Sequence, residues 1–343
     1  MTDRLQVFGA TPSPYTLKLL ALLRFKHIPY SIHWGDITSN LKKFNLEPAK
    51  PSLLPSVIMD SNHLKSVSTD TTPIIENLEI TNPLRPVLPT HSVLKFLNYI
   101  LEDFGDEWMT KYMFHYRWHF KKDADNAEIL LPLTNYMNIS DEDLHTFGKF
   151  ISSRQKERLW VVGSNKETAK LIEQSYIELL ECLEKHFKQH SFLLGNFPSS
   201  SDFAFFGQLQ QLINFDPTPR ALAHKYSMRT VAWINNLHDL SGYDIDDRNE
   251  IYDNDIMLSL SMLFQEISKL YVPCMVANHQ ACKSGDETWE IEINGSTWKQ
   301  KSFKYQFKCI EWIRERFQQL SSDDRKIIRD FFENTNCHDL IKV

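Results

Sequence analysis

The first 25 residues restrict the fold more than any other part of the chain, because they predict a strand, a tight turn and a helix with a defined start. Residues 5–9 form a short apolar run typical of a buried strand, and residues 15–24 have the composition of a helix. Ser13 stands where a helix N-cap belongs, and Pro14 stands at the first helical position, where its missing N–H costs nothing. A helix N-terminus favours an anion. Ser13 is therefore either a simple cap or a hydrogen-bond donor to an anionic ligand.

A second constraint is the proline at position 55. Leu54 and Pro55 directly precede an apolar run, residues 56–60, and a turn then leads to a second short strand from His63 to Val67. A proline is tolerated as the first residue of a strand because no ladder hydrogen bond is needed from its nitrogen there. The segment predicts a hairpin that begins at Pro55.

Asp70 and Thr71 place an acid and a hydroxyl at the start of an amphipathic helix that runs to Glu79. An N-cap hydroxyl and free backbone amides can hold a carboxylate, and an acidic side chain can hold an ammonium group. The alternative interpretation is an ordinary capped helix without a ligand.

Ser199 and Asp202 have the spacing of a capping box immediately before an apolar run, residues 203–209. In a capping box each of the two residues satisfies a free N–H group of the other. The segment, preceded by Phe192-Leu193-Leu194-Gly195, predicts the start of a buried helix, so its role is structural.

Taken together, these segments resemble the glutathione transferase superfamily over about residues 1–240. The resemblance is to cytosolic members with a serine-containing active-site motif, and it assigns no class. It implies an α/β N-terminal domain of the thioredoxin-like type, followed by an all-α domain.

The resemblance also implies a site for glutathione as co-substrate. Pro55 would be cis, and Leu54 would offer its backbone N–H and C=O to the cysteine of glutathione. Asp70 and Thr71 would hold the γ-glutamyl end, although they replace the Glu and Ser typical of the family. Ser13 would donate a hydrogen bond to the sulfur and, with the helix dipole, lower the pKa of the thiol.

The chain is longer than this family pattern. We expect a thioredoxin-like domain at residues 1–80, a proline-rich linker at 81–90, an all-helical domain at 91–240 and an unusual extension at 241–343. Asn294-Gly295 lies between two runs that alternate apolar and polar residues, which predicts a β-hairpin within the extension. So small a hairpin is marginal alone, so we expect it to dock on the helical domain.

Aromatic and histidine side chains crowd the helix expected at about residues 106–120. In transferase-like folds the corresponding helix lines the pocket for the second, apolar substrate. The resemblance therefore implies that Trp108, Tyr112, His115 and Tyr116 line such a pocket together with Tyr15. The same pattern also fits inter-helix core or dimer packing.

His115 and His119 are four residues apart, a spacing on a helix that can bind zinc. No His-Glu-x-x-His motif surrounds them, and the sequence shows no obvious third ligand. We therefore expect no metal.

The composition excludes several classes of function. The net charge is −6, from 38 basic and 44 acidic residues, so the chain lacks the basic field of a nucleic-acid-binding protein. No run approaches 18 apolar residues, so we expect no membrane partner. The 5 cysteines are scattered, which indicates reduced thiols and a cytoplasmic protein.

The predicted function is conjugation of the glutathione thiolate to an electrophilic apolar small molecule, a detoxification reaction, by a possible homodimer. The alternative is a catalytically silent protein with the transferase fold that serves as a binding or scaffold module. The extension and the departures at Asp70 and Thr71 keep that alternative open.

Overall fold

The computed structural model describes residues 4–61, 64–245 and 252–342. It begins with a mixed sheet in the order β2-β1-β3-β4, in which β1 is parallel to β2 and antiparallel to β3. This is the predicted thioredoxin-like fold. His63, the expected start of the last strand, lies outside the described residues. The elements are β1 Leu5–Gly9, α1 Pro14–Phe25, β2 Tyr30–Trp34, α2 Ile37–Lys42, β3 Ser56–Ser61, β4 Leu64–Ser68 and α3 Thr71–Thr81.

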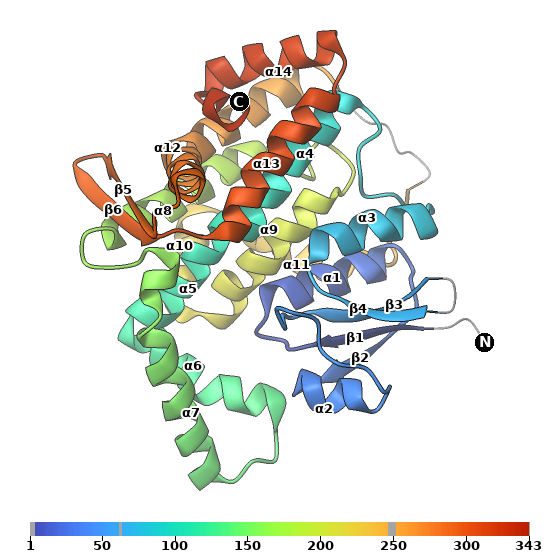
Figure 1. Ribbon diagram of the computed structural model, residues 1–343, viewed down its shortest axis with the longest axis vertical. Coiled ribbons are helices and arrows are strands. Elements are labelled where there is room, and N and C mark those ends of the chain that lie inside the picture. Colours follow the sequence, from blue (N-terminus) through green and yellow to red (C-terminus); the bar gives the residue numbers. More distant parts are fainter. Residues whose placement is uncertain (1–3, 62–63, 246–251, 343) are drawn as a thin grey trace.

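The two faces of this sheet pack against different helices because side chains alternate along a strand. Val7 and Val57, which are partners in register, join the large core that includes α1 and α3. Phe8 and Ile58 point to the other face and pack against Leu41 of α2. α1 and α3 therefore lie between the sheet and the rest of the molecule (Figure 1).

The second region is helical, as predicted, and α9 packs directly against α1 (Figure 1). Gly207 allows this close approach, since a Cβ atom there would collide with the carbonyl oxygen of Pro14. The elements are α4 Ser92–Asp103, a π-helix Phe104–Trp108, α5 Met109–His119, α6 Lys121–Asn135, α7 Asp141–Lys156, a 3₁₀ turn Leu159–Val162, α8 Ala169–His186, α9 Ser200–Gln210, a π-helix Gln211–Phe215, α10 Pro217–Tyr226 and α11 Met228–Leu237.

The predicted capping box begins α9. The carboxylate of Asp202 accepts hydrogen bonds from the backbone N–H of Ser199 at 2.8 Å and from that of Leu193 at 2.8 Å. Asp202 is fully buried, so this one side chain satisfies N–H groups that water cannot reach.

The extension packs on the helical region. The turn of its hairpin has positive φ at both Asn294 and Gly295, which suits the twist of the strands. Trp298 of the hairpin is fully buried and lies 5.5 Å from Trp108, between ring centroids. No helix in the described part of the chain is long and apolar enough to cross a membrane. The elements are α12 Asn254–Ser284, β5 Thr288–Ile293, β6 Ser296–Lys301, α13 Lys304–Gln319, α14 Ser322–Thr335 and a 3₁₀ turn His338–Leu340.

The substitution Asp202→Ala tests the cap. We expect it to lower the free energy of unfolding by about 1–3 kcal/mol, because buried N–H groups lose their acceptor. Urea unfolding measures the change. Asp143→Ala is the matched control, since Asp143 belongs to the exposed Ser140 cap of α7 and should cost less. Equal losses at the two positions would contradict the burial argument.

Candidate functional site

A cavity of about 460 Å³ lies where α1, the loop before β3, α3, α5 and α13 meet. The predicted glutathione-site residues all line it, as does Tyr15, although they come from separate segments of the first 71 residues. The full lining is Ser13, Pro14, Tyr15, Ser52, Leu53, Leu54, Pro55, Asp70, Thr71, Asp106, Glu107, Met113 and Tyr305.

Ser13 is the N-cap of α1. Its hydroxyl oxygen accepts a hydrogen bond from the backbone N–H of Thr16 at 3.2 Å. Within the described ranges its hydroxyl proton is donated to no other residue. The side chain can therefore cap the helix and still donate a hydrogen bond into the cavity.

The Leu54–Pro55 peptide bond is cis, as the resemblance implied. The backbone N–H and C=O of Leu54 bond to no other residue that the structure describes. Unpaired main-chain groups beside a cavity can pair with the main chain of a peptide-like ligand.

Asp70 is the N-cap of α3 and has a φ of 75°, which is uncommon for a residue other than glycine. One carboxylate oxygen accepts from the N–H of Thr72 at 3.2 Å, and the other accepts from the hydroxyl of Tyr305 at 2.5 Å. Thr71 beside it is 3% exposed. Tyr305 belongs to the extension, 235 positions later, and no signal in the sequence predicted its place in the site.

Tyr15 lines the cavity with its ring, while its hydroxyl donates to the carbonyl oxygen of Asp106 at 2.8 Å. Burial raises the pKa of Tyr15 well above its usual value, with the charges of Glu107 and Asp106 acting in the same direction. Tyr15 is therefore a neutral phenol that fixes α1 against the π-helix that follows α4.

Two acidic side chains, those of Asp106 and Glu107, form an acidic wall of the cavity. Burial raises the pKa of Asp106 to about 7 and that of Glu107 to about 8. Oδ1 of Asp106 is buried and has no hydrogen-bond partner. Glu107 is therefore held as the carboxylic acid at neutral pH, whereas Asp106 also has an ion-pair partner, Lys18.

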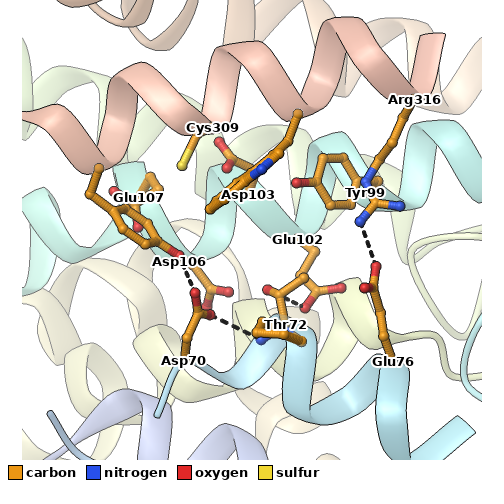
Figure 2. A pocket seen from close by; sticks show the side chains of 13 residues that line it. Asp70, Thr72, Glu76, Tyr99, Glu102, Asp103, Asp106, Glu107, Cys309 and Arg316 are labelled. Carbon is orange, nitrogen blue, oxygen red and sulfur yellow. Dashed lines mark hydrogen bonds and ion pairs between the residues drawn. The ribbon is translucent and has the colours of Figure 1, made fainter. Parts of the chain in front are cut away.

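The acidic wall continues into a smaller adjoining cavity of about 200 Å³. Figure 2 shows the acidic residues of α3 and α4 below α13. Glu76 pairs with Arg316 of α13 at 2.6 Å. Burial raises the pKa of Asp103 to about 6, and it raises the pKa of the Cys309 thiol well above its usual value, so that thiol is not a reactive thiolate.

Lys18 supplies the positive charge behind this wall. Its Nζ atom lies 2.8 Å from Glu102 and 2.6 Å from Asp106, and the residue is only 1% exposed. Burial alone would lower the pKa of Lys18, but the two carboxylates outweigh it and hold the pKa above its usual value. Lys18 is therefore a permanent cation between α1 and α4.

The expectation that the aromatic face of α5 lines a substrate pocket is corrected by the structure. Trp108, Tyr112, His115 and Tyr116 are 0–3% exposed and do not line the cavity; Tyr15 alone of the expected pocket residues does. Their side chains face the helical core, where the Trp108 indole N–H donates to the Tyr112 hydroxyl at 3.1 Å. The alternative of inter-helix packing is the one observed.

No protein family model and no curated protein matches the sequence. Among solved structures, the β-etherase LigF from Sphingobium sp. strain SYK-6 is 18% identical, with a TM-score of 0.47 over 68% of this chain and 95% of that chain. A glutathione transferase family member from Pseudomonas fluorescens pf-5, with two glutathione bound, is 14% identical, with a TM-score of 0.41 over 69% and 87% of the two chains. A glutathione transferase homolog from Lodderomyces elongisporus, with two GSH per subunit, is 14% identical, with a TM-score of 0.36 over 69% and 98%.

The architecture follows from the strand order of the sheet and from the capped α9, which packs on α1. The fold class is the predicted one, a thioredoxin-like region followed by a helical region. The extension from α12 onward is added to these two regions, and it contributes Tyr305 to the cavity wall.

Lys18→Met tests the buried cation. It should lower the free energy of unfolding by about 3–5 kcal/mol, because the carboxylates of Glu102 and Asp106 lose their shared partner. Chemical unfolding measures the loss, with Lys122→Met on the exposed face of α6 as the control. A loss as small as that of the control would show that the ion pair does not hold the two regions together.

The raised pKa of Glu107 predicts a pH-dependent stability. The ordinary pKa of a glutamate is about 4.3, and that of Glu107 in the folded protein is about 8. At pH values between these two, the folded protein keeps a proton that the unfolded chain releases, so the free energy of unfolding falls as the pH rises. Glu107→Gln removes this effect. Its stability relative to the wild type should therefore increase from pH 5 to pH 8, by at most about 1.4 kcal/mol per pH unit. Urea unfolding at each pH measures it, and the exposed Glu287→Gln should show no such trend.

Proposed function

We propose that the protein binds glutathione in the 460 Å³ cavity and transfers its thiolate to an electrophilic small molecule. The observation that carries the proposal is that Ser13, Leu54, Pro55, Asp70 and Thr71 line this one cavity. Each has a different role in binding the tripeptide, and their separate positions in the sequence make a chance arrangement a poor explanation.

Each part of glutathione has a matching group in the cavity. The free N–H and C=O of Leu54 pair with the backbone of its cysteine. The N-terminus of α3 at Thr71 attracts the γ-glutamyl carboxylate, and Asp70 takes the ammonium group. Ser13 then faces the thiol from the N-terminus of α1.

The thiolate needs stabilisation because a free cysteine thiol has a pKa of about 8.5. Lowering that pKa by two units requires about 2.7 kcal/mol. A hydrogen bond from Ser13 to a charged sulfur contributes about 1.5–3 kcal/mol, and the helix N-terminus contributes about 0.3–2 kcal/mol. These two contributions are sufficient in magnitude.

The carboxyl groups of Asp106 and Glu107 would repel the thiolate whenever they are ionised. At an effective dielectric constant of 20, one charged carboxylate about 6 Å from the sulfur costs nearly 3 kcal/mol, which cancels the gain from Ser13. Burial raises the pKa of Glu107 to about 8, so its protonated form removes that penalty at neutral pH. The charge of Asp106 is offset by its ion pair with Lys18. Activity therefore depends on Glu107 being protonated and on Lys18 compensating the charge of Asp106.

The second substrate is an apolar electrophile in this proposal. Leu53, Met113 and the rings of Tyr15 and Tyr305 supply apolar surface beside the position assigned to the sulfur. A detoxification role, a cytoplasmic location and a homodimer belong to the same proposal. The 5 cysteines are all free thiols, which agrees with a reducing compartment, and light scattering after size exclusion measures the oligomeric state.

A catalytically silent binding protein is the second candidate. It is favoured by the carboxyl groups facing Ser13 and by the Tyr305 hydroxyl that already bonds to Asp70. In that case glutathione would bind as the thiol and would not be ionised.

Ser13→Ala distinguishes these functions. We expect the wild type to bind glutathione and to conjugate a chloronitroaromatic, with turnover in Ser13→Ala reduced at least tenfold because the sulfur loses its donor. Ser13→Thr keeps the hydroxyl and is the matched variant that should retain turnover. Calorimetry measures binding, and product absorbance measures turnover.

Two other results would have different meanings. Glutathione binding with no turnover in any variant would favour the silent protein. No glutathione binding by the folded wild type would refute the whole proposal.

A further inference from the structure

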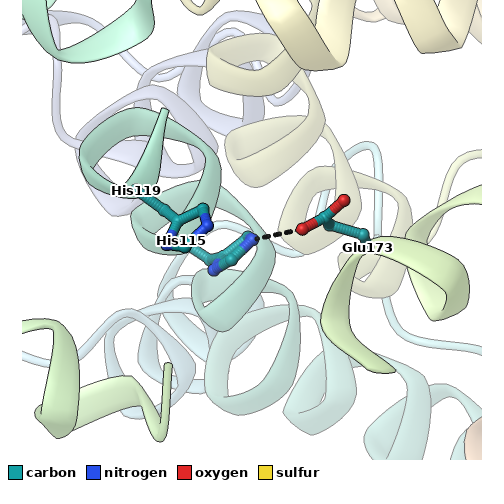
Figure 3. Close-up of side chains that lie close together, drawn as sticks. All are labelled: His115, His119 and Glu173. Atoms are coloured by element: carbon teal, nitrogen blue, oxygen red, sulfur yellow. Dashed lines mark ion pairs between the residues drawn. The ribbon is translucent and has the colours of Figure 1, made fainter. Parts of the chain in front are cut away.

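A group of potential metal ligands lies where α5 and α8 meet, and it takes no part in the function proposed above. His115 and His119 are one turn apart on α5, and Glu173 comes from α8 (Figure 3). One ligand atom from each residue lies within 4.8 Å of those of the other two. In residues 4–61, 64–245 and 252–342, this is the single group of three or more histidine, cysteine or acidic residues so arranged.

His115 is poised to use one nitrogen as a ligand. The residue is fully buried, and its Nε2 atom has no hydrogen-bond partner. The nearest carboxylate oxygen, Oε1 of Glu173, is 3.6 Å away, too far for a hydrogen bond. Burial lowers the pKa of His115 to about 3, so the ring is neutral at physiological pH. A buried imidazole nitrogen without a partner is costly, and its lone pair is available to a ligand.

The other nitrogen of His115 is held in place. Nδ1 lies 2.8 Å from the hydroxyl oxygen of Ser164. When Nδ1–H donates to that oxygen, the lone pair of Nε2 is directed toward Glu173. Metal-bound histidines characteristically have such a bond on the second nitrogen, which fixes the tautomer and the ring orientation.

We propose that His115, His119 and Glu173 bind a divalent transition-metal cation of the zinc type. Two imidazoles and one carboxylate form a ligand set that suits zinc better than magnesium or calcium, which prefer oxygen ligands. Water would complete the coordination. The ion would link α5 to α8 and would give the buried Nε2 atom of His115 the partner that it lacks.

The spacing of His115 and Glu173 is close to that of ligands in a zinc site. Ligand atoms about 2.0–2.2 Å from a tetrahedral zinc ion are about 3.3 Å apart, and the His115–Glu173 distance of 3.6 Å is already close to this value. The His119 ring is exposed and stacks on that of His115 at 4.6 Å, and Glu173 is partly exposed. Both side chains are free to close around an ion.

A second histidine pair in the chain shows why the spacing alone is not enough. His186 and His190 are also four residues apart, but both ring nitrogens of His186 are used within the protein. Nδ1 lies 2.7 Å from the Ser259 hydroxyl, and Nε2 lies 3.0 Å from the carbonyl oxygen of Phe192. This pair therefore provides a matched control within the same protein.

Zinc titration of the full chain after chelator treatment tests the proposal. Isothermal calorimetry with Zn²⁺ alone should show one site with a dissociation constant in the micromolar range or tighter. His119→Asn and Glu173→Gln alter exposed or partly exposed side chains and should preserve the fold, as circular dichroism checks. Each should weaken binding at least tenfold, whereas His190→Asn should not change it.

Thermal unfolding gives an independent readout, since an ion that binds the folded state raises the melting temperature. Zn²⁺ should raise that of the wild type and of His190→Asn, with a smaller shift for His119→Asn. The proposal is overturned if the wild type binds no Zn²⁺, or if His119→Asn and Glu173→Gln both bind it as tightly as the wild type does.

Discussion

The buried ion pairs of Lys18 hold the first region of the protein against the helical region. One ammonium group bonds to Glu102 and Asp106, and Glu102 also accepts hydrogen bonds from Thr72 at 3.0 Å and from Ser200 at 2.5 Å. The carboxylate of Glu102 on α4 thus bonds to residues of three other helices, α1, α3 and α9. A buried carboxylate is tolerated only when its oxygens are satisfied in this way. The position of Ser13, slightly more than one turn before Lys18 in α1, depends on this arrangement.

The π-helix after α4 determines which groups reach the cavity. It spans Phe104–Trp108, and two successive acidic residues within it, Asp106 and Glu107, both line the cavity. Such wide turns are rare and are frequent at functional sites. Gly105 in the same turn lies against Ala204, where a Cβ atom would come within 2.9 Å of the Ala204 side chain. The close packing of α9 therefore fixes the turn that presents the two acids.

The sequence predicted features that depend on neighbouring residues in the chain. The caps at Ser13 and Ser199 and the Asn294-Gly295 turn were found because local backbone chemistry specifies them. The acid and hydroxyl at Asp70 and Thr71 were recognised on the same basis.

Features that depend on distant partners were missed or misjudged. A lysine such as Lys18 is ordinarily exposed, and only Glu102 and Asp106 account for its burial. Trp108 fitted either a pocket or a core, and its packing against Trp298, 190 positions away, decides between them. Likewise, no pattern in the sequence predicts that Glu173 lies beside His115, because the two residues belong to different helices, α8 and α5.

The hydrogen bond from Tyr305 to Asp70 brings the extension to the same carboxylate that a ligand ammonium group would use. Each carboxylate oxygen can accept two hydrogen bonds, so a ligand ammonium group at Asp70 can share this oxygen with the phenol of Tyr305. By reciprocity, the extension changes the affinity of that ligand by the same factor by which the ligand changes the attachment of the extension. The packing of the extension and the binding of such a ligand are therefore linked through one carboxylate, that of Asp70.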